Sequence, residues 1–415
     1  MHLISVLHAL VFAKCTFARD GQAVGNYCGT EEIAEYPEWD SGPELLSVNT
    51  FFRHGTRADY RRTTCFKQGA QTMYTSSLST GFELLTVHNS TPARNTISKN
   101  YKRGFQVGEI LDYSAIQMKR LGTYLRESYP NIYEKTNLRN LFLRSTDTQR
   151  TLGSLNLLLS NLEGESKELS YVVETDDFEY DPLNLNCQSC LKASQIRDDF
   201  PHSEEFLELL ASTQYFQCAK RWKDEVGTDF DISQGFDCLI APTCAKVPFP
   251  GDLVPSDTLI ECVSELALAI RRMRYSSSNG VDFCQLATAP FLVDLLDNIE
   301  SNKSGLWSTH DDTLVCILSS AGIWDGEWPH YGAFISIESY ADKSIRVIRD
   351  GVDIARLSIE GIVREDIRSR EGLMHRCNRA VSVPTVAEEP EVLQSVGWGV
   401  RLMGVFSIVG LLAIF

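Results

Sequence analysis

Three short apolar runs in this chain end abruptly in polar residues. They cover residues 45–52, 141–143 and 305–309, and helical patterns follow the second and third runs over 149–159 and 314–321. Each unit predicts a buried strand, a polar loop and a helix that begins with Ser, Thr or Asp. Strands separated by helices connect through right-handed crossovers. We therefore predict an α/β fold with a mostly parallel central sheet flanked by helices.

The polar loops after these strands carry the candidate chemistry. In a parallel sheet the carboxyl ends of the strands lie at one edge, where ligands bind, so we expect the loops to converge there. A single histidine is more often structural than functional, and the joint occurrence of polar groups at three strand ends is what supports a site. The side chains concerned are Arg53, His54, Arg57, Arg144, His310 and Asp311.

The stretch over residues 200–298 has a different pattern. Helical periodicity over 203–213, 259–273 and 286–298 is separated by loops that contain Cys and Pro. We predict a helical cap, inserted at about these positions, that covers the edge of the sheet. Residues 60–105 are rich in Ser, Thr, Gly and Asn and lack clear periodicity, so we expect a long exposed excursion there.

The two ends of the chain indicate its compartment. Residues 1–18 follow the pattern of a secretory signal peptide, with an apolar run and small residues before a cleavage site after Ala18. The last residues, 402–415, form an apolar tail, which is shorter than the roughly 20 residues of a free-standing transmembrane helix. We expect residues 396–415 to be a membrane tail, either a GPI-attachment signal or a transmembrane segment.

Cysteines and glycosylation sequons agree with secretion. The chain has 12 cysteines, which is typical of an oxidising compartment. Removal of the signal peptide leaves an odd number, so we expect a free thiol and take Cys316, in an apolar run, as the candidate. Cys187-x-x-Cys190 has no second pair at zinc-ligand spacing, which favours a disulfide role. Asn89 and Asn302 begin N-glycosylation sequons.

The overall charge excludes one class of partner. Lys plus Arg number 39 against 55 Asp plus Glu, which gives a formal net charge of −16. A nucleic-acid binder needs clustered positive charge to meet the phosphate backbone, so we expect no nucleic-acid partner. Hydrophobic residues make up 43% and charged residues 23%, as in an ordinary folded soluble protein. The arginines of the predicted sheet edge would be a local focus of positive charge in an acidic body.

The residue types in the three loops suit phosphoryl chemistry. The Arg-His-Gly-x-Arg turn at residues 53–57 places two guanidinium groups beside one imidazole. A guanidinium binds two phosphate oxygens with its planar fork, and its positive charge keeps the His54 imidazole neutral and therefore nucleophilic. Arg144 would add a third fork and His310 a hydrogen-bond donor. Asp311 would be a carboxyl group that can protonate a leaving alkoxide.

The same set of groups needs no metal. Several cationic groups around one phosphoryl group stabilise its oxygens by themselves. The chain contains no H-E-x-x-H sequence, paired acidic motif or P-loop. We therefore expect neither a metal nor another cofactor.

At these residues the chain resembles the histidine phosphatase superfamily, in its histidine acid phosphatase branch. The Arg-His-Gly-x-Arg signature is followed by further motifs in the family's order, which makes the resemblance specific over Leu45 to Tyr340. These motifs are Gln117-Met118-x-x-Leu121-Gly122, Arg144-Ser145-Thr146-Asp147-x-x-Arg150-Thr151, His310-Asp311-x-Thr313-Leu314 and Pro329-x-Tyr331 to Glu338-x-Tyr340.

The resemblance implies a fold and a role for each matched residue. Over residues 19–395 it implies an α/β sandwich with a helical cap, and phosphomonoester hydrolysis through a phosphohistidine. His54 matches the nucleophile and Asp311 matches the proton donor. The implied phosphate pocket consists of Arg53, Arg57, Arg144 and His310.

Two departures from the family pattern lie next to the first motif. Thr56 replaces the commoner acidic residue, and Asp59 stands where Pro is usual. They concern the entrance and the substrate choice. The resemblance also implies a disulfide that joins one of two neighbouring cysteines to Cys377. The full set of disulfide candidates is Cys187, Cys190, Cys238 and Cys377.

These observations predict a metal-independent acid phosphatase of the secretory pathway. It would be extracellular, at the cell surface or lysosomal, and attached to a membrane through its tail. One alternative is a narrower phytase or lipid-phosphate phosphatase. Another is an inactive surface binding protein on the same scaffold, which the intact site residues disfavour. An intracellular mutase is disfavoured by the signal peptide and the cysteine count.

Overall fold

The computed structural model describes most of the chain between residues 26 and 378. The predicted signal peptide, the tail, Asn89, Cys187 and most of the 60–105 excursion lie outside the described residues. Those residues are 26–30, 32–39, 42–59, 66, 74, 83–88, 108–134, 138–163, 170–177, 180–185, 190–251, 253–362, 368 and 370–378.

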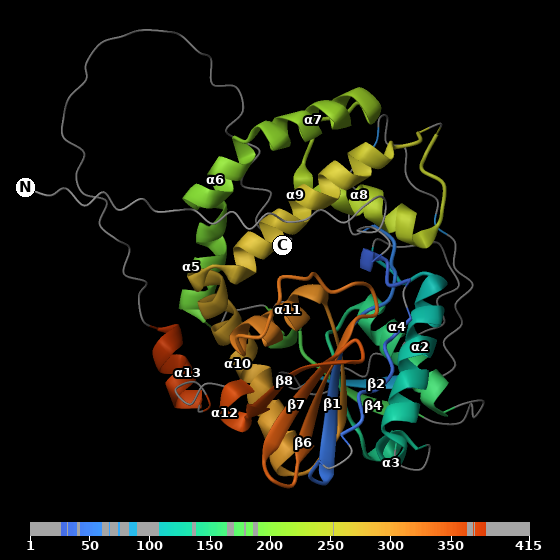
Figure 1. The fold of residues 1–415 in the computed structure, drawn as a ribbon, viewed down its shortest axis with the longest axis vertical. Helices are drawn as coiled ribbons and strands as arrows, with labels where there is room; N and C mark the ends of the chain where they lie inside the picture. The colour runs from blue at the N-terminus through green and yellow to red at the C-terminus, as the bar shows by residue number, and fades with distance from the viewer. Residues whose placement is uncertain are drawn as a thin grey trace, which may run out of the picture.

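An eight-stranded sheet forms the centre of the molecule, in the order β2-β4-β3-β5-β1-β6-β7-β8 (Figure 1). Neighbours from β2 to β1 are parallel, and the pairs from β1 to β8 are antiparallel. The predicted α/β class is confirmed, and the parallel part contains all three predicted strands. The strands are β1 (Leu45–Arg53), β2 (Glu83–His88), β3 (Phe142–Ser145), β4 (Ser170–Thr175), β5 (Gly305–Thr309), β6 (Phe334–Tyr340), β7 (Ser344–Arg349) and β8 (Val352–Ser358).

Both faces of β1 are buried, which explains its near-continuous apolar sequence. Successive side chains of a strand point to opposite faces, so Phe51 and Phe52 enter different cores, and neither is exposed. The Phe51 ring stacks on Trp307 of β5, with ring centroids 4.8 Å apart. Phe52 belongs to the core on the other face, together with Met118 and Leu155.

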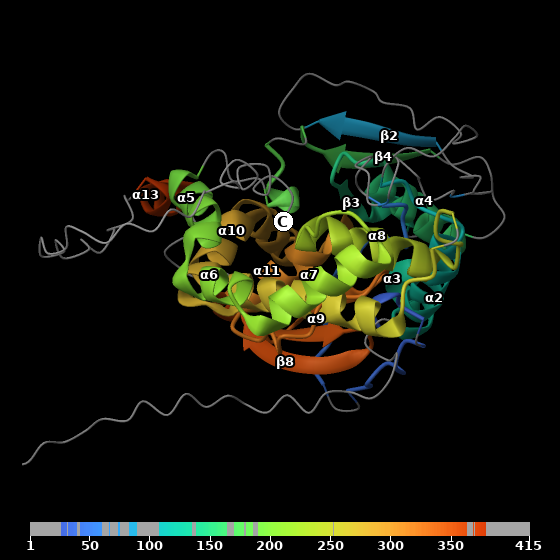
Figure 2. The ribbon, with the colours of Figure 1, turned by 90° about the horizontal axis from the view of Figure 1, so that it is seen from above.

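Helices cover both faces of the sheet and make a three-layer sandwich. Figures 1 and 2 show α2, α3 and α4 on one side of the sheet and α10 and α11 on the other. Their bounds are α2 (Tyr113–Ser128), α3 (Pro130–Tyr133), α4 (Gln149–Glu163), α10 (Ser278–Glu300) and α11 (Asp311–Ser320). Two short helices follow the last strand, α12 (Ile359–Ile362) and α13 (Arg370–Cys377).

The described chain between β4 and α10 consists of helices and loops. Ser203, Ser212, Asp231 and Ser256 begin four helices here, and each side chain accepts a hydrogen bond from a backbone N–H of the first turn. These helices share a core of their own that includes Trp222. We call these four helices and the helix that precedes them the cap. The cap consists of α5 (Leu191–Asp199), α6 (Glu204–Leu210), α7 (Thr213–Glu225), α8 (Ile232–Ala245) and α9 (Asp257–Ser276).

Disulfides join elements that are distant in the sequence. Cys28 is bonded to Cys244 of α8, and Cys218 of α7 is bonded to Cys262 of α9. The structure also pairs Cys190 with Cys377, as expected for one of the two neighbouring cysteines.

The expectation that Cys316 is a free thiol is wrong. Cys316 of α11 forms a disulfide with Cys284 of α10, and the two Cα atoms are 4.6 Å apart. The packing of α11 against α10 brings these buried sulfurs together, which the apolar sequence around Cys316 could not reveal. All nine cysteines in the described part of the chain are disulfide-bonded, Cys238 included. The bonds indicate an oxidising, lumenal or extracellular compartment.

The predictions of a glycosylation site at Asn302 and of a membrane segment both concern the surface of the protein. Asn302 is exposed in the turn between α10 and β5, where a sequon is accessible. No helix among these residues is both long and apolar enough to cross a membrane.

Candidate active site

His54 directly follows the carboxyl end of β1. Its backbone N–H donates to the carbonyl of Thr309 at the end of β5, over 3.0 Å, and its carbonyl accepts from Gly332. The ring Nδ1 lies 2.9 Å from the carbonyl oxygen of Gly55, which can only accept. Nδ1 therefore carries the proton, and Nε2 keeps its lone pair. A Cβ added at Gly55 would lie 2.6 Å from Ser114 of α2, so only glycine fits this turn.

The surroundings of His54 keep its imidazole neutral. Burial is the largest cause of a pKa well below the usual 6.5, and the charges of Arg150, Arg53, His310 and Arg57 lower the pKa further. Only 3% of the residue is exposed. A neutral imidazole with an available Nε2 is a nucleophile at acidic pH, where an ordinary histidine would be protonated.

Arg53, the last residue of β1, is buried and firmly held. One guanidinium nitrogen donates to the Pro329 carbonyl over 2.8 Å. The other lies 2.7 Å from the Tyr27 hydroxyl and 2.9 Å from the Asp311 carboxylate. The Tyr27 and Tyr331 rings lie 4.7 and 4.1 Å from the guanidinium carbon, and the two rings pack edge-to-face against each other.

Arg57 connects the site to the cap. Its Nη1 lies 2.9 Å from the carboxylate of Asp237, on α8, and also donates to the carbonyl of Ala58. The side chain is 14% exposed, so Arg57 lies at the border between the buried site and solvent. An isolated bridge to Ile110 fixes the backbone of Arg57.

His310 and Asp311 lie at the start of α11, directly after β5. The His310 ring is 5.5 Å from the His54 ring, centroid to centroid. Its Nε2 lies 3.0 Å from the Thr146 hydroxyl, and its Nδ1 faces Arg150. Burial first, and then Arg150, hold the pKa of His310 well below its usual value, although Asp311 opposes this shift.

Asp311 is ionised in this arrangement. Its Oδ2 lies 2.9 Å from Arg53 and accepts a hydrogen bond from the Trp328 indole over 3.0 Å. Burial opposes ionisation, but Arg53, Arg271 and Trp328 outweigh it and hold the pKa of Asp311 below its usual range. The carboxylate is thus fixed beside His310, with a fifth of the side chain exposed.

Arg144 does not belong to this group, which corrects the expectation for the second loop. It lies in β3, and its Nη2 is 2.6 Å from Asp181 and 2.8 Å from Asp176. Two carboxylates that the chain supplies after β4 therefore neutralise this guanidinium. The pattern of the sequence could place an arginine at a strand end but could not show which carboxylates would meet it.

Arg150 is the third arginine of the site. Arg150 is the second residue of α4, whereas Arg144 lies in β3, the strand that precedes this helix. Its charge is the largest contribution after burial to the lowered pKa of both His54 and His310. The signal for it was present in the Asp147-x-x-Arg150-Thr151 motif, in the first turn of the helix that follows the loop.

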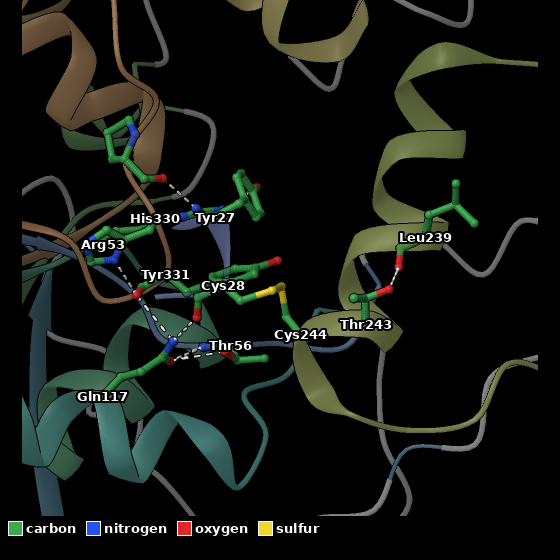
Figure 3. Close-up of a disulfide and its surroundings, with 11 residues drawn as sticks. Tyr27, Cys28, Arg53, Thr56, Gln117, Leu239, Thr243, Cys244, His330 and Tyr331 are labelled. Carbon is green, nitrogen blue, oxygen red and sulfur yellow. Dashed lines mark hydrogen bonds between the residues drawn. A yellow bond between two sulfur atoms is a disulfide. The ribbon is translucent and has the colours of Figure 1, made fainter. Parts of the chain in front are cut away.

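A second missed residue is Gln117 of α2, which ties the Arg-His-Gly turn to the cap side. Its Oε1 accepts from the Thr56 backbone N–H over 2.8 Å, and its Nε2 donates to the Cys28 carbonyl over 2.7 Å. Figure 3 shows Gln117 between Thr56 and Cys28, with the Cys28–Cys244 disulfide leading to α8. Gln117 therefore braces the turn that follows His54.

The assembled groups form a compact anion site. Two neutral imidazoles lie among the guanidinium groups of Arg53, Arg57 and Arg150, and one carboxylate lies beside them. Such an arrangement can surround the oxygens of one phosphoryl group and present a nucleophile to it. Among the described residues no group of three or more His, Cys, Asp or Glu side chains could hold a metal ion. Metal independence stays a prediction.

Comparison with known proteins finds relatives among the phosphatases. The family model described as "Histidine phosphatase superfamily (branch 2)" matches residues 44–195. The human lysophosphatidic acid phosphatase type 6 is 26% identical over 260 residues, which cover 58% of each protein. The bovine protein of the same name is 24% identical, over 72% of this chain and 75% of that protein. Mouse testicular acid phosphatase is 23% identical, over 72% and 68%. The match thus spans less than two thirds of the human relative.

Solved structures agree on the fold. The apo form of the phytase from Hafnia alvei superposes with a TM-score of 0.52 at 12% identity, over 75% of this chain and 84% of that one. At this identity the likeness speaks for the fold alone. The family model, the acid phosphatase relatives and the fold lead to one conclusion. The chain is similar to the histidine acid phosphatase family, branch 2 of the histidine phosphatase superfamily, whose model matches residues 44–195.

Proposed function

We propose that this protein hydrolyses phosphomonoesters through a covalent phosphohistidine on His54, with Asp311 as the proton donor. One observation carries the proposal: a buried, neutral imidazole whose Nδ1 donates to the Gly55 carbonyl, so that Nε2 is available among three arginines. The relatives described as acid phosphatases support the same class of reaction.

In the first step Nε2 of His54 attacks phosphorus. The phosphoryl oxygens bind to Arg53, Arg57 and Arg150, whose positive charge stabilises the transition state. The bond from phosphorus to the ester oxygen breaks as the Nε2–P bond forms. Asp311 gives its proton to the departing alkoxide, so that a neutral alcohol leaves.

This step requires a protonated Asp311, although the carboxyl group is ionised in the unliganded site. A bound phosphate group would change that in two ways. Its negative charge disfavours a second anion nearby, and it competes with Asp311 for the guanidinium of Arg53. Substrate binding therefore raises the pKa of Asp311, and the protonated fraction of this carboxyl group is largest in acidic solution.

In the second step water attacks the phosphohistidine. The Asp311 carboxylate accepts a proton from the water, and the P–Nε2 bond breaks to release inorganic phosphate and regenerate neutral His54. His310 lies beside the same phosphoryl group, with its Nε2 held by the Thr146 hydroxyl, while Arg144 has a structural role in this account.

The compartment and the substrate class follow from the same proposal. We place the protein outside the cytosol, in the secretory pathway, at the cell surface or in the lysosome, with its C-terminal tail as a membrane attachment. The substrates named in its relatives include lysophosphatidic acid and 2-phosphoxylose. A general phosphomonoesterase fits this range, with a narrower lipid-phosphate or phytase activity as the alternative.

A phosphomonoester panel between pH 3 and 8, with EDTA present, tests the proposal. We expect turnover of an aryl phosphate at pH 5, because His54 stays neutral there. EDTA should leave this turnover unchanged, because the proposed mechanism uses no metal ion. His54→Ala should abolish turnover while unfolding at the same temperature as the wild type. His202→Ala, an exposed histidine of the cap side, is the matched control and should keep full activity. Turnover by the His54→Ala protein would refute the mechanism, and no turnover of any substrate would favour an inactive binding protein.

A further inference from the structure

The arginine nearest the solvent side of the site is held by a carboxylate of the cap. Arg57 Nη1 lies 2.9 Å from Asp237 Oδ1, and both side chains are mostly buried, with exposed fractions of 14% and 21%. Any phosphoryl group that binds Arg57 therefore shares its guanidinium group with the Asp237 carboxylate. Nothing in the sequence motifs of the site singles out Asp237, because it lies on α8, far from them in the chain.

A second carboxylate lies at the same side of the site. Asp59 follows Arg57 by two residues and stands where the family pattern usually has proline. Burial, and after it the charge of Asp237, raises the pKa of Asp59 to about 6, while Arg57 opposes the shift. The two carboxyl groups are thus close enough to repel each other, and Arg57 is the cation that they share.

The position of Asp237 is fixed by its neighbours. The preceding residue, Phe236, packs edge-on against Tyr27 with ring centroids 5.1 Å apart, and the guanidinium carbon of Arg271 lies 4.3 Å from the centroid of the Phe236 ring. The Cys28–Cys244 disulfide ties α8 to the segment that carries Tyr27 (Figure 3). Tyr27 in turn contacts Arg53. Asp237 is therefore part of the wall of the site.

The charges around the site are divided unequally. Arg53, Arg150 and the two histidines surround the place of the transferred phosphoryl group with one carboxylate, Asp311, whereas the Arg57 side carries two carboxyl groups against one guanidinium. A substrate whose alcohol part carries a further phosphate would bring that charge toward the cap, where like charges repel it. A neutral or cationic alcohol part meets no such penalty.

We propose that Asp237, together with Asp59, is a specificity-determining residue that selects phosphomonoesters without a second anionic group and disfavours polyphosphorylated substrates. This inference rests on the function proposed above. Because Asp237 also occupies a nitrogen of Arg57, its removal should improve the binding of every phosphate. The ratio between substrates of different charge is therefore the informative quantity.

Steady-state kinetics at pH 7, above the pKa of about 6 for Asp59, tests the proposal. The substrates are p-nitrophenyl phosphate, phosphoethanolamine with its cationic group, and fructose 1,6-bisphosphate with its second phosphate. We expect Asp237→Asn to raise the ratio of kcat/KM for the bisphosphate over that for the aryl phosphate about tenfold, and to lower the ratio for phosphoethanolamine. Asp59→Asn should change the ratios in the same directions by less.

Two control variants separate charge from fold. Asp237→Glu keeps the charge and should keep the wild-type ratios. Asp229→Asn removes a carboxylate from the cap that is 98% exposed and paired with Lys223, and it should change nothing. A change of less than twofold in both ratios for Asp237→Asn, in a protein that melts like the wild type, would overturn the proposal. Should Asp237→Asn fail to fold, the same criterion applies to Asp59→Asn.

A binding measurement keeps this test separate from the test of turnover. Calorimetry with phenylphosphonate and methylenebisphosphonate, which are not hydrolysed, compares a single with a double anionic group. We expect Asp237→Asn to strengthen binding of the bisphosphonate about tenfold more than that of the monophosphonate. An absence of turnover in the wild type would refute the proposed function but leave this ratio decisive. Turnover with an unchanged ratio would refute the charge selection alone.

Discussion

Two arginines that lie six residues apart in the sequence, Arg144 in β3 and Arg150 in α4, have opposite surroundings. Arg144 lies within 2.8 Å of both Asp176 and Asp181, so two carboxyl groups surround one guanidinium group there. Arg150 lies beside two neutral histidines, where arginines are in excess. A buried guanidinium that is already neutralised holds the fold together, whereas one among other cations attracts an anion. The balance of charge, and not the residue type, separates the two roles.

The largest expected effect is the loss of activity when Arg150 is replaced. Arg150→Ala removes one of the cations around the phosphoryl group, so we expect kcat/KM for an aryl phosphate to fall about 10³-fold. The melting temperature should stay close to that of the wild type, because a guanidinium amid other cations contributes little to stability. A loss of less than tenfold would show that Arg150 is not part of the pocket.

Substitution of Arg144, in contrast to that of Arg150, should reduce the stability of the protein more than its activity. Arg144→Leu leaves the buried Asp181 without its cation, so we expect the free energy of unfolding at pH 7 to fall by about 3 to 5 kcal/mol. Urea denaturation measures this loss. The fraction that remains folded should keep its kcat within a few-fold of the wild type, and a loss as large as that of Arg150→Ala would place Arg144 in the pocket after all.

The pH sharpens the comparison further. Burial raises the pKa of Asp181 to about 6, and Arg144 opposes that shift. Without Arg144 the folded-state pKa rises further above the unfolded value, so the variant gains stability as pH falls through it. We expect the destabilisation by Arg144→Leu to be at least about 1 kcal/mol smaller at pH 5 than at pH 7. An equal loss at both pH values would mean that Asp181 does not depend on Arg144.

The smallest expected effect concerns the hydrogen bond from Trp328 to Asp311. Trp328→Phe keeps the ring but removes the donor, at a cost of about 1 kcal/mol, and we expect kcat to fall roughly 3- to 10-fold. The hydrogen bond lowers the pKa of Asp311, so its loss should move the alkaline limb of the pH–rate profile to higher pH. A lower kcat with an unmoved profile would point to a packing effect.

The parallel part of the fold could be predicted from local sequence. β1, β3 and β5 are short apolar runs with abrupt polar ends, and hydrogen bonding between their backbones brings His54 and His310 to one edge. The first turn of α11 likewise follows from its acidic start. These features depend on residues that are close in the chain.

The remaining features depend on contacts between distant segments. The pairing of Arg144 with Asp181 and that of Cys316 with Cys284 arise only when helices and loops pack. Asp237 reaches Arg57 from a helix of the cap that carries no motif. Local patterns place a charged or sulfur-containing side chain on an element, but its partner decides its role.

The central claim is that His54 carries the phosphoryl group during turnover. The most direct measurement is rapid quenching in base with ³²P-labelled substrate, followed by mass spectrometry of the labelled peptide. The account predicts a base-stable, acid-labile phosphoryl group on His54, formed at the rate of turnover and absent in His54→Ala. Turnover without any labelled enzyme, or a label on another residue, would contradict it.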